Sequence, residues 1–170
     1  MSLTKTPICD FGKQAENFKL KSTDGKFLKL EDLKGKNGTL IMFICNHCPY
    51  VKAIISDVVK DCNVLSKLGV NSVAICSNDV INYPEDSFEN MSIFSKKNNF
   101  NFSYLHDETQ EVAKKYGAVC TPDFFGYNRN LELQYRGRIR ELKDLKPIRD
   151  GDSDLLLAMT QISKTGNGPK

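Results

Sequence analysis

Apolar side chains recur along this chain with two different periods, and the periods separate predicted strands from predicted helices. Residues 38–44 and 71–77 are nearly continuous apolar runs, which predict strands covered on both faces. From residue 51 to residue 68 the apolar positions instead follow helical spacing, with charged residues on the opposite side. This stretch predicts a long amphipathic helix that starts at the second of two closely spaced cysteines.

Shorter patterns complete the series of elements. Residues 17–30 predict a β-hairpin, because Asp24-Gly25 between alternating apolar residues is a strong turn signal. Further segments predict a helical turn over 30–35, helices over 84–98, 110–117 and 152–163, a strand over 102–105, and strands over 123–128 and 131–137 joined by a turn. Since strands alternate with helices, we expect one three-layer α/β domain over residues 8–165 and a flexible tail over 166–170.

Composition and charge exclude two classes of partner. The net charge is +3, but the basic residues are scattered rather than clustered with aromatic residues, so nucleic-acid binding is not expected. The longest apolar run, 39–45, is far shorter than the ~20 residues of a membrane span. Because no charged-then-apolar segment opens the chain, we expect a cytoplasmic protein without membrane contact.

Two cysteines carry the candidate chemistry. Cys45 and Cys48 flank Asn46 and His47, where a predicted strand gives way to the long helix. Free amide protons and the helix dipole at this point favour a thiolate, so we expect a lowered pKa and an exposed, attacking Cys45. Cys48, one helical step further on, can turn back and resolve a mixed disulfide.

Other functions of this pair stay open. A zinc or copper carrier also uses Cys-X-X-Cys, and His47, Cys120 or His106 could add ligands, although structural zinc sites usually combine two such motifs. An inert structural pair is disfavoured by the reactive position at a helix start. We therefore expect neither a metal nor another cofactor. Of the remaining cysteines, Cys62 and Cys76 fit a buried core, and Cys9 has no evident partner.

The sequence "VCTPDFF", residues 119–125, places a proline just ahead of a strand that follows a helix. Together with the Cys-X-X-Cys pair, this resembles the thioredoxin fold, in which a cis proline faces the dithiol. The resemblance implies a mixed central sheet with an N-terminal β-hairpin, and it implies that Thr121, Pro122 and Asn46 position the substrate. The segments "FICNHCPYVK", "SNDVINYPEDSFENM", "CTPDFFGYN" and "YRGRI" are similar to the peroxiredoxin-like, AhpC/TSA-like redoxins over about residues 10–145.

Several positions depart from these families. The strand over 38–44 lacks the buried carboxylate that thioredoxins use as a proton acceptor, so we consider His47 for that role. Against the peroxiredoxin motif, Cys48 stands at the peroxidatic position, Cys45 replaces Thr or Ser, and Ile41 replaces the proline. The usual activating arginine is also missing, which leaves Arg136 or Arg138 as candidates.

The resemblance thus predicts a thiol–disulfide oxidoreductase using Cys45, Cys48 and His47. The alternatives are a thiol-dependent peroxidase with an antioxidant role and a metal carrier. Cys120 is either a third redox thiol or a small residue that fits its loop. The expected partners are a protein or small-molecule disulfide, or a peroxide, and an unidentified thiol reductant.

Overall fold

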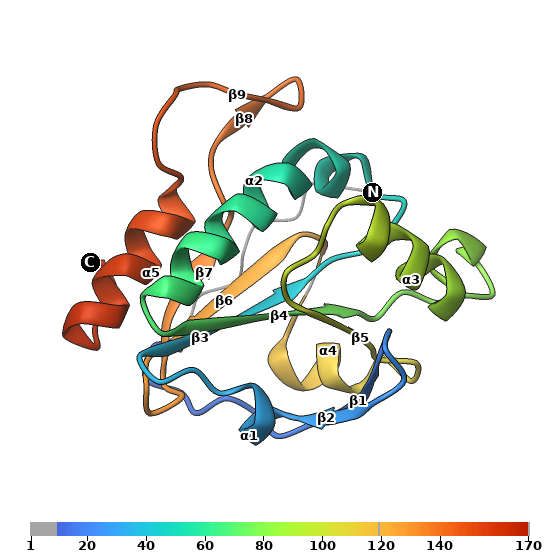
Figure 1. The fold of residues 1–170 in the computed structure, drawn as a ribbon, viewed down its shortest axis with the longest axis horizontal. Helices are drawn as coiled ribbons and strands as arrows, with labels where there is room; N and C mark the ends of the chain where they lie inside the picture. Colours follow the sequence, from blue (N-terminus) through green and yellow to red (C-terminus); the bar gives the residue numbers. More distant parts are fainter. Residues whose placement is uncertain (1–9, 119, 170) are drawn as a thin grey trace.

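A mixed seven-stranded sheet forms the centre of the molecule (Figure 1). The computed structural model describes residues 10–118 and 120–169. In spatial order the strands are β2 (Phe27–Lys29), β1 (Lys19–Ser22), β5 (Ser103–His106), β4 (Val70–Cys76), β3 (Gly38–Phe43), β6 (Asp123–Tyr127) and β7 (Leu133–Gly137). Strands β3, β4 and β5 are parallel, and each of the other pairings is antiparallel.

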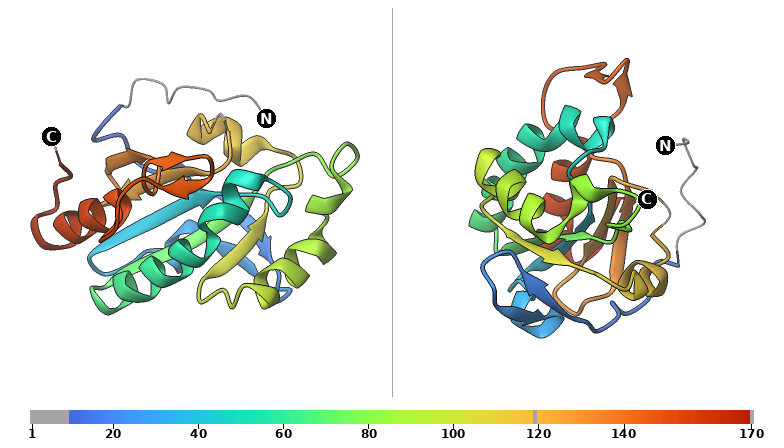
Figure 2. Two further views of the ribbon diagram at one scale, coloured as in Figure 1. Left: turned by 90° about the horizontal axis from the view of Figure 1, so that it is seen from above. Right: turned by 90° about the vertical axis from the view of Figure 1, so that its right-hand side faces the viewer.

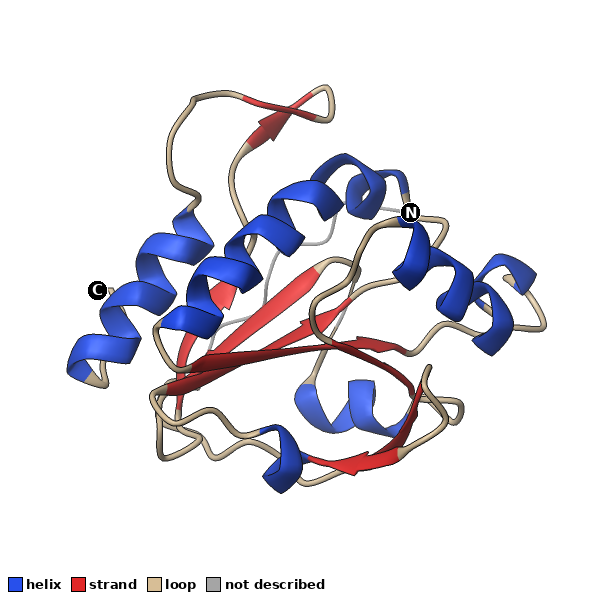
Figure 3. Cartoon of the chain, viewed as in Figure 1, coloured by secondary structure: helices blue, strands red, loops and turns tan. Residues whose placement is uncertain are grey.

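Helices cover both faces of this sheet, as the layers in Figure 3 show. The helical segments are α1 (Leu30–Leu33), α2 (Pro49–Lys67), η1 (Pro84–Asp86), α3 (Phe88–Lys97), α4 (Glu111–Tyr116) and α5 (Asp154–Thr165). Side chains of α2, α3 and α5 share one buried cluster, and those of α1 and α4 share another on the opposite face. The predicted three-layer α/β/α sandwich with an N-terminal hairpin is therefore confirmed.

Strand β3 lies inside the sheet and carries the chain toward the two cysteines. All six of its residues are buried, and it pairs in parallel with β4 and antiparallel with β6. Leu40 and Met42 join the cluster beneath α2 and α5, whereas Ile41 and Phe43 join the cluster on the other face. The alternation of a strand explains why the run needs apolar residues at every position.

Two expectations about the elements need correction. The single helix expected over 84–98 is split into η1 and α3, because Ser87 has an extended ψ of 156° and its side chain caps α3 by accepting from the N–H of Asn90. A small hairpin of β8 (Leu142–Lys143) and β9 (Lys146–Pro147) was not anticipated. Its turn uses Asp144 and Leu145 at positive φ instead of glycine, so the usual turn signal is missing. Figure 2 shows this hairpin projecting from the body of the molecule.

The proposed domain limits stay a prediction. Residues 8 and 9, including Cys9, and residue 170 lie outside the described residues. In the expected tail, the N–H of Gly168 donates to the side chain of Gln134 at 3.3 Å. Among residues 10–118 and 120–169, the helices are too short or too polar to span a membrane.

Helix α5 is fixed to α2 by a buried polar contact. Ser153 caps α5 by accepting from the N–H of Leu156 at 2.9 Å, and its hydroxyl donates to Asp61 at 2.5 Å. Both residues are almost fully buried. Burial raises the pKa of the Asp61 carboxyl, and the Ser153 hydroxyl opposes this shift. One hydroxyl therefore serves both the helix start and a buried carboxylate.

Replacing Ser153 by alanine should lower the free energy of unfolding by about 1 to 3 kcal/mol, since it removes a helix cap and a hydrogen bond of a buried carboxylate. Urea denaturation followed by circular dichroism measures this difference. Ser163→Ala is the matched control, because its hydroxyl donates only within α5, to the Thr160 carbonyl. Equal stability of the two variants would contradict the assignment of Ser153.

Candidate active site

The two cysteines lie in the connection between β3 and α2. The chain leaves β3 at Phe43, and Ile44 still donates a backbone hydrogen bond to Ile75 at 3.0 Å. Cys45 follows, and Cys48 is the N-cap residue of α2, with Pro49 at the first helical position. Both cysteines have 0% exposed surface. The expectation of an exposed Cys45 is therefore wrong, whereas the expectation of a recessed Cys48 is confirmed.

The cis peptide bond between Thr121 and Pro122 brings Thr121 against both sulfurs. The Cys45 sulfur lies 3.4 Å from the Thr121 hydroxyl, and in its thiol form Cys48 can donate to the Thr121 carbonyl at 3.6 Å. Residues separated by more than seventy positions are thus in direct contact. The structure joins Cys45, Cys48, Thr121 and Pro122 in one place, as the resemblance implied.

The electrostatic environment distinguishes the two thiols. A hydrogen bond from the Cys45 thiol lowers the pKa of Cys48 to about 5, aided by the backbone N–H groups of Val51 and Tyr50 and opposed by burial. The hydrogen bond to Cys48, and then burial, raise the pKa of Cys45 well above its ordinary value. The hydrogen bond between the sulfurs therefore favours the thiolate on Cys48 and the protonated form of Cys45.

This distribution corrects the expectation that the Cys45 thiolate is the stabilised one. The first cause is the hydrogen bond between the two sulfurs, and the position of the helix start adds to it. Because α2 begins at Pro49, its free amide protons reach the sulfur of the N-cap residue, Cys48. Cys45 lies three residues earlier, beyond the reach of these donors.

Asn46 is held inside the protein by both ends of its side chain. Its amide donates to the carbonyl of Glu85 at 2.9 Å and accepts from the Tyr104 hydroxyl at 2.8 Å. Its backbone N–H donates to Asp86 at 2.7 Å. These contacts fix the loop between the cysteines, and they direct the Asn46 side chain toward protein partners.

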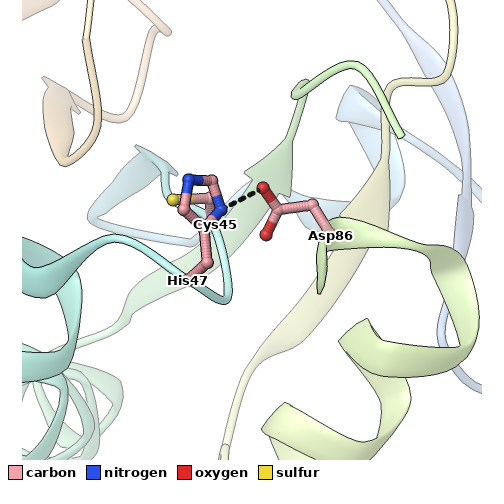
Figure 4. Close-up of side chains that lie close together, drawn as sticks. All are labelled: Cys45, His47 and Asp86. Carbon is pink, nitrogen blue, oxygen red and sulfur yellow. Dashed lines mark hydrogen bonds and ion pairs between the residues drawn. The ribbon is translucent and has the colours of Figure 1, made fainter. Parts of the chain in front are cut away.

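His47 is oriented by two neighbours. Its Nδ1 lies 2.6 Å from Oδ2 of Asp86, and its ring stacks on Tyr83 with centroids 4.9 Å apart and an angle of 9° between the planes. The side chain is 26% exposed. As Figure 4 shows, the Cys45 sulfur lies beside the same ring, and the sulfur, a ring nitrogen and an Asp86 oxygen lie within 4.8 Å of one another.

Asp86 was not predicted from the sequence as a site residue. Pro84-Glu85-Asp86 fits the ordinary proline and acids of a helix start, so it gave no sign of a buried carboxylate. In the structure Asp86 is fully buried and accepts from Asn46, His47 and the side chain of Asn78. The missing acid in β3 was the available signal, since it implied that a carboxylate had to come from another element.

Cys45, His47 and Asp86 lie close together and are residue types that bind metals. Their hydrogen bonds, however, are not those of a free set of metal ligands. Both oxygens of Asp86 already accept N–H groups, at 2.7 Å on Oδ1 and at 2.6 and 2.7 Å on Oδ2. Cys48, which the metal hypothesis requires, is not part of this close group of described residues. We therefore assign the group as a hydrogen-bonded histidine–carboxylate pair next to a thiol.

A cavity of about 420 Å³ opens beside the dithiol. His47, Tyr83, Lys114, Cys120 and Thr121 are among its lining residues. Cys120 is half-buried, and burial followed by the Asp123 charge raises its pKa, against the opposing effect of a nearby arginine. Thus Cys120 lies at the wall of a cavity that also touches the dithiol region.

Both candidate arginines bind carboxylates, and the charge of Arg136 also lowers the pKa of Cys120. Arg136 binds the Asp123 carboxylate at 2.9 Å and the Gly117 carbonyl at 2.7 Å, and its guanidinium lies over the ring of Phe125. Arg138 is exposed and pairs with Glu141 and Asp154. That one of them activates Cys45 or Cys48 stays a prediction.

Comparisons with known proteins agree with this geometry. The model of a family described as AhpC/TSA matches residues 11–142. A Coxiella burnetii protein whose name places it among bcp peroxiredoxins is 28% identical over 117 residues, 69% of this chain and 72% of that protein. The crystal structure of an uncharacterised conserved protein from Geobacillus kaustophilus is 41% identical, with a TM-score of 0.93, over 100% of this chain and 90% of its own.

A more distant structure shows the same fold. It is the thioredoxin domain of a thiol-disulfide oxidoreductase from Bacteroides vulgatus, with 15% identity and a TM-score of 0.64 over 76% of this chain and 89% of that one. These comparisons confirm the resemblance to redoxins, the thioredoxin-like fold class and the general prediction of an oxidoreductase.

The thiolate of Cys48 should be visible in a pH titration. Ultraviolet absorbance of the reduced protein should rise with a midpoint near pH 5, the value to which the pKa of Cys48 is lowered. Because this pKa lies below the unfolded value of 9.0, the reduced protein should also gain stability as pH rises from about 5 toward 9.

Cys48→Ser should remove this transition. Cys62→Ser is the matched control, because burial raises the pKa of that thiol to about 12. A low transition that survives in Cys48→Ser would show that another thiol carries the charge.

Proposed function

Because the chain belongs to the AhpC/TSA family, we propose that it is a thiol–disulfide oxidoreductase whose Cys45 and Cys48 cycle between a dithiol and a disulfide. The observation that carries this proposal is the contact of both sulfurs with Thr121, at the cis peptide bond before Pro122. The shared proton between the sulfurs supports it further, because thiol–disulfide exchange requires a thiolate.

In the proposed reaction Cys45 attacks the substrate disulfide and Cys48 resolves the product. Cys45 contacts the Thr121 hydroxyl, next to a cavity that a substrate can enter. The hydrogen bond from Cys45, and then the N–H groups at the start of α2, lower the pKa of Cys48, and this favours its attack on the mixed disulfide. The second step is intramolecular and therefore has a high effective concentration.

Substrate and compartment follow from the same proposal. The partners are a protein or small-molecule disulfide and a thiol reductant that regenerates the dithiol. We propose the cytoplasm as the site of action, where thiol systems keep such pairs reduced. In that compartment the dithiol acts as a reductant of its substrate.

A second candidate function is a thiol-dependent peroxidase, favoured by the lowered pKa of Cys48 at a helix start. Peroxiredoxin chemistry needs a cationic group beside the thiolate, and here the Arg136 guanidinium is bound to Asp123. We therefore expect hydrogen peroxide to react more slowly than a disulfide peptide.

Stopped-flow reaction of the reduced protein with a disulfide peptide tests the assignment. Cys45→Ser should abolish the reaction, whereas Cys48→Ser should stop at a mixed disulfide with Cys45 that mass spectrometry detects. Cys76→Ser, a buried thiol with a pKa raised to about 12, is the matched control. An unchanged rate in Cys45→Ser would refute the proposal, and a faster reaction with hydrogen peroxide that needs Cys48 would favour the peroxidase.

A further inference from the structure

The carboxylate of Asp86 is removed from water and surrounded by hydrogen-bond donors. Its side chain is fully buried, and its oxygens accept from the Asn46 backbone at 2.7 Å, from the Asn78 amide at 2.7 Å and from His47 at 2.6 Å. A buried carboxylate is costly unless such donors compensate it. Two of the three donors, Asn46 and His47, belong to the loop between the cysteines. The burial of the Asp86 carboxylate is therefore compensated mainly by this loop.

These contacts define the orientation and the tautomer of His47. Because a carboxylate oxygen only accepts, the Nδ1 atom that faces Asp86 carries a hydrogen, so in the neutral ring Nε2 holds the lone pair. The stacking on Tyr83 fixes the plane of the ring. In Figure 4 the Cys45 sulfur is drawn beside the edge of the ring that faces away from Asp86, and the three groups lie within 4.8 Å of one another.

Cys45 needs a proton acceptor at this position. Its thiol donates to Cys48 and is buried, and both effects raise its pKa. If Cys48 accepted this proton, it would no longer be the thiolate that resolves the mixed disulfide, so a different acceptor is needed. Strand β3 offers no carboxylate, since its residues are Gly38, Thr39 and four apolar side chains. The loop itself supplies another candidate acceptor, the imidazole of His47, which lies close to the Cys45 sulfur.

We infer that His47, held by Asp86, is the general base that removes the proton of Cys45, with Asp86 as the positioning residue. This inference rests on the proposed disulfide exchange, and it names the group that handles the proton. Strand β3 has no acidic residue. Asp86 in η1 supplies the carboxylate instead, and it acts through the imidazole of His47. A histidine whose second nitrogen is bound by a carboxylate is fixed in both tautomer and direction.

Each step of the proposed reaction balances. As the Cys45 sulfur attacks a disulfide R–S–S–R′, its proton passes to Nε2 of His47, a Cys45–S–R bond forms and R′S⁻ leaves. The imidazolium gives this proton to R′S⁻, which departs as R′SH. The Cys48 thiolate then attacks the Cys45 sulfur, forms the internal disulfide and expels RS⁻, which takes a proton from the solvent.

The surroundings of His47 allow this transfer. Its ring lines the cavity of about 420 Å³, so a leaving thiolate in that cavity is adjacent to the imidazole. Titratable and charged groups face the histidine from its own loop and from four neighbouring segments: Cys45 and Cys48 from the loop, Lys52 from α2, Tyr83, Glu85 and Asp86 at η1, Lys114 from α4, and Cys120. Among the described contacts of these groups, the hydrogen bond or ion pair to the ring comes from Asp86.

Nitrogen NMR of the imidazole rings tests the geometry without any substrate. The chain contains two histidines, so His106→Gln identifies the signals of His47. The neutral His47 ring should carry its hydrogen on Nδ1, and Asp86→Asn should remove that preference. A dominant Nε2–H form in the unmodified protein would overturn the inference, and this result does not depend on how the Asp86 variant folds.

Kinetics of mixed-disulfide formation tests the role. His47→Gln should slow attack by Cys45 on a disulfide peptide at least tenfold, within the range of general base catalysis. The pH dependence of this rate should differ between this variant and the unmodified protein. Asp86→Asn should slow the same step, and the double variant should be no slower than His47→Gln alone, because Asp86 acts through His47.

Two controls separate this inference from the function on which it rests. His106→Gln and Asp61→Asn, a change at a buried carboxylate in the second half of α2, should leave the rate unchanged. Suppose that Cys45→Ser abolishes the reaction while His47→Gln retains the rate and pH profile of the unmodified protein. The exchange function then stands, and the general-base role of His47 is wrong. If Cys45→Ser reacts normally, the proposed function itself fails.

Discussion

A buried carboxylate must find hydrogen-bond donors, and Asp86 finds them mainly in the loop that carries the dithiol. The backbone of Asn46 and the ring of His47 supply two donors, and Asn78, just beyond β4, supplies the third. Through these bonds the end of β3, the segment after β4 and η1 become one rigid unit. The positions of Cys45 and Cys48 depend on this unit together with the side-chain bonds of Asn46 and the stacking of His47 on Tyr83.

The second constraint is the start of α2. A helix presents free amide protons only at its first turn, so the residue at the cap receives the negative charge. Here this residue is Cys48. Cys45 therefore keeps the proton and contacts Thr121 next to the cavity. The two sulfurs are prepared for different steps of one exchange reaction, although they are separated by only two residues.

Much of the fold could be predicted from the sequence, because periodicity decides strands and helices wherever one face is buried. The run at β3, the long pattern of α2 and the Asp24-Gly25 turn were sufficient to place these elements. The break at Ser87 and the hairpin at Asp144-Leu145 were not visible. In those places a single cap or an unusual positive φ decides the structure.

The site was predicted in part for a similar reason. Cys45, Cys48 and the Thr121–Pro122 bond follow from motifs with fixed spacing. The partner of His47 does not, because Asp86 lies 39 positions further along the chain and looks like a helix-start acid. The distribution of charge between the thiols was also misjudged, because it depends on whether α2 starts at Pro49 or a turn earlier. The pattern of a single sequence says least about contacts between distant segments and about the residues at which helices begin and end.

The most direct test of the account is a redox titration of the purified protein in thiol–disulfide buffers, with alkylation and peptide mass mapping of the free cysteines. We predict that Cys45 and Cys48 lose their free thiols together in a single reversible two-electron transition, within the roughly −270 to −120 mV of dithiol oxidoreductases. Cys62 and Cys76 should stay reduced throughout, since both are buried and their pKa values are raised to about 12. A pair that remains reduced across this range, or oxidation that joins other cysteines first, would contradict the central claim.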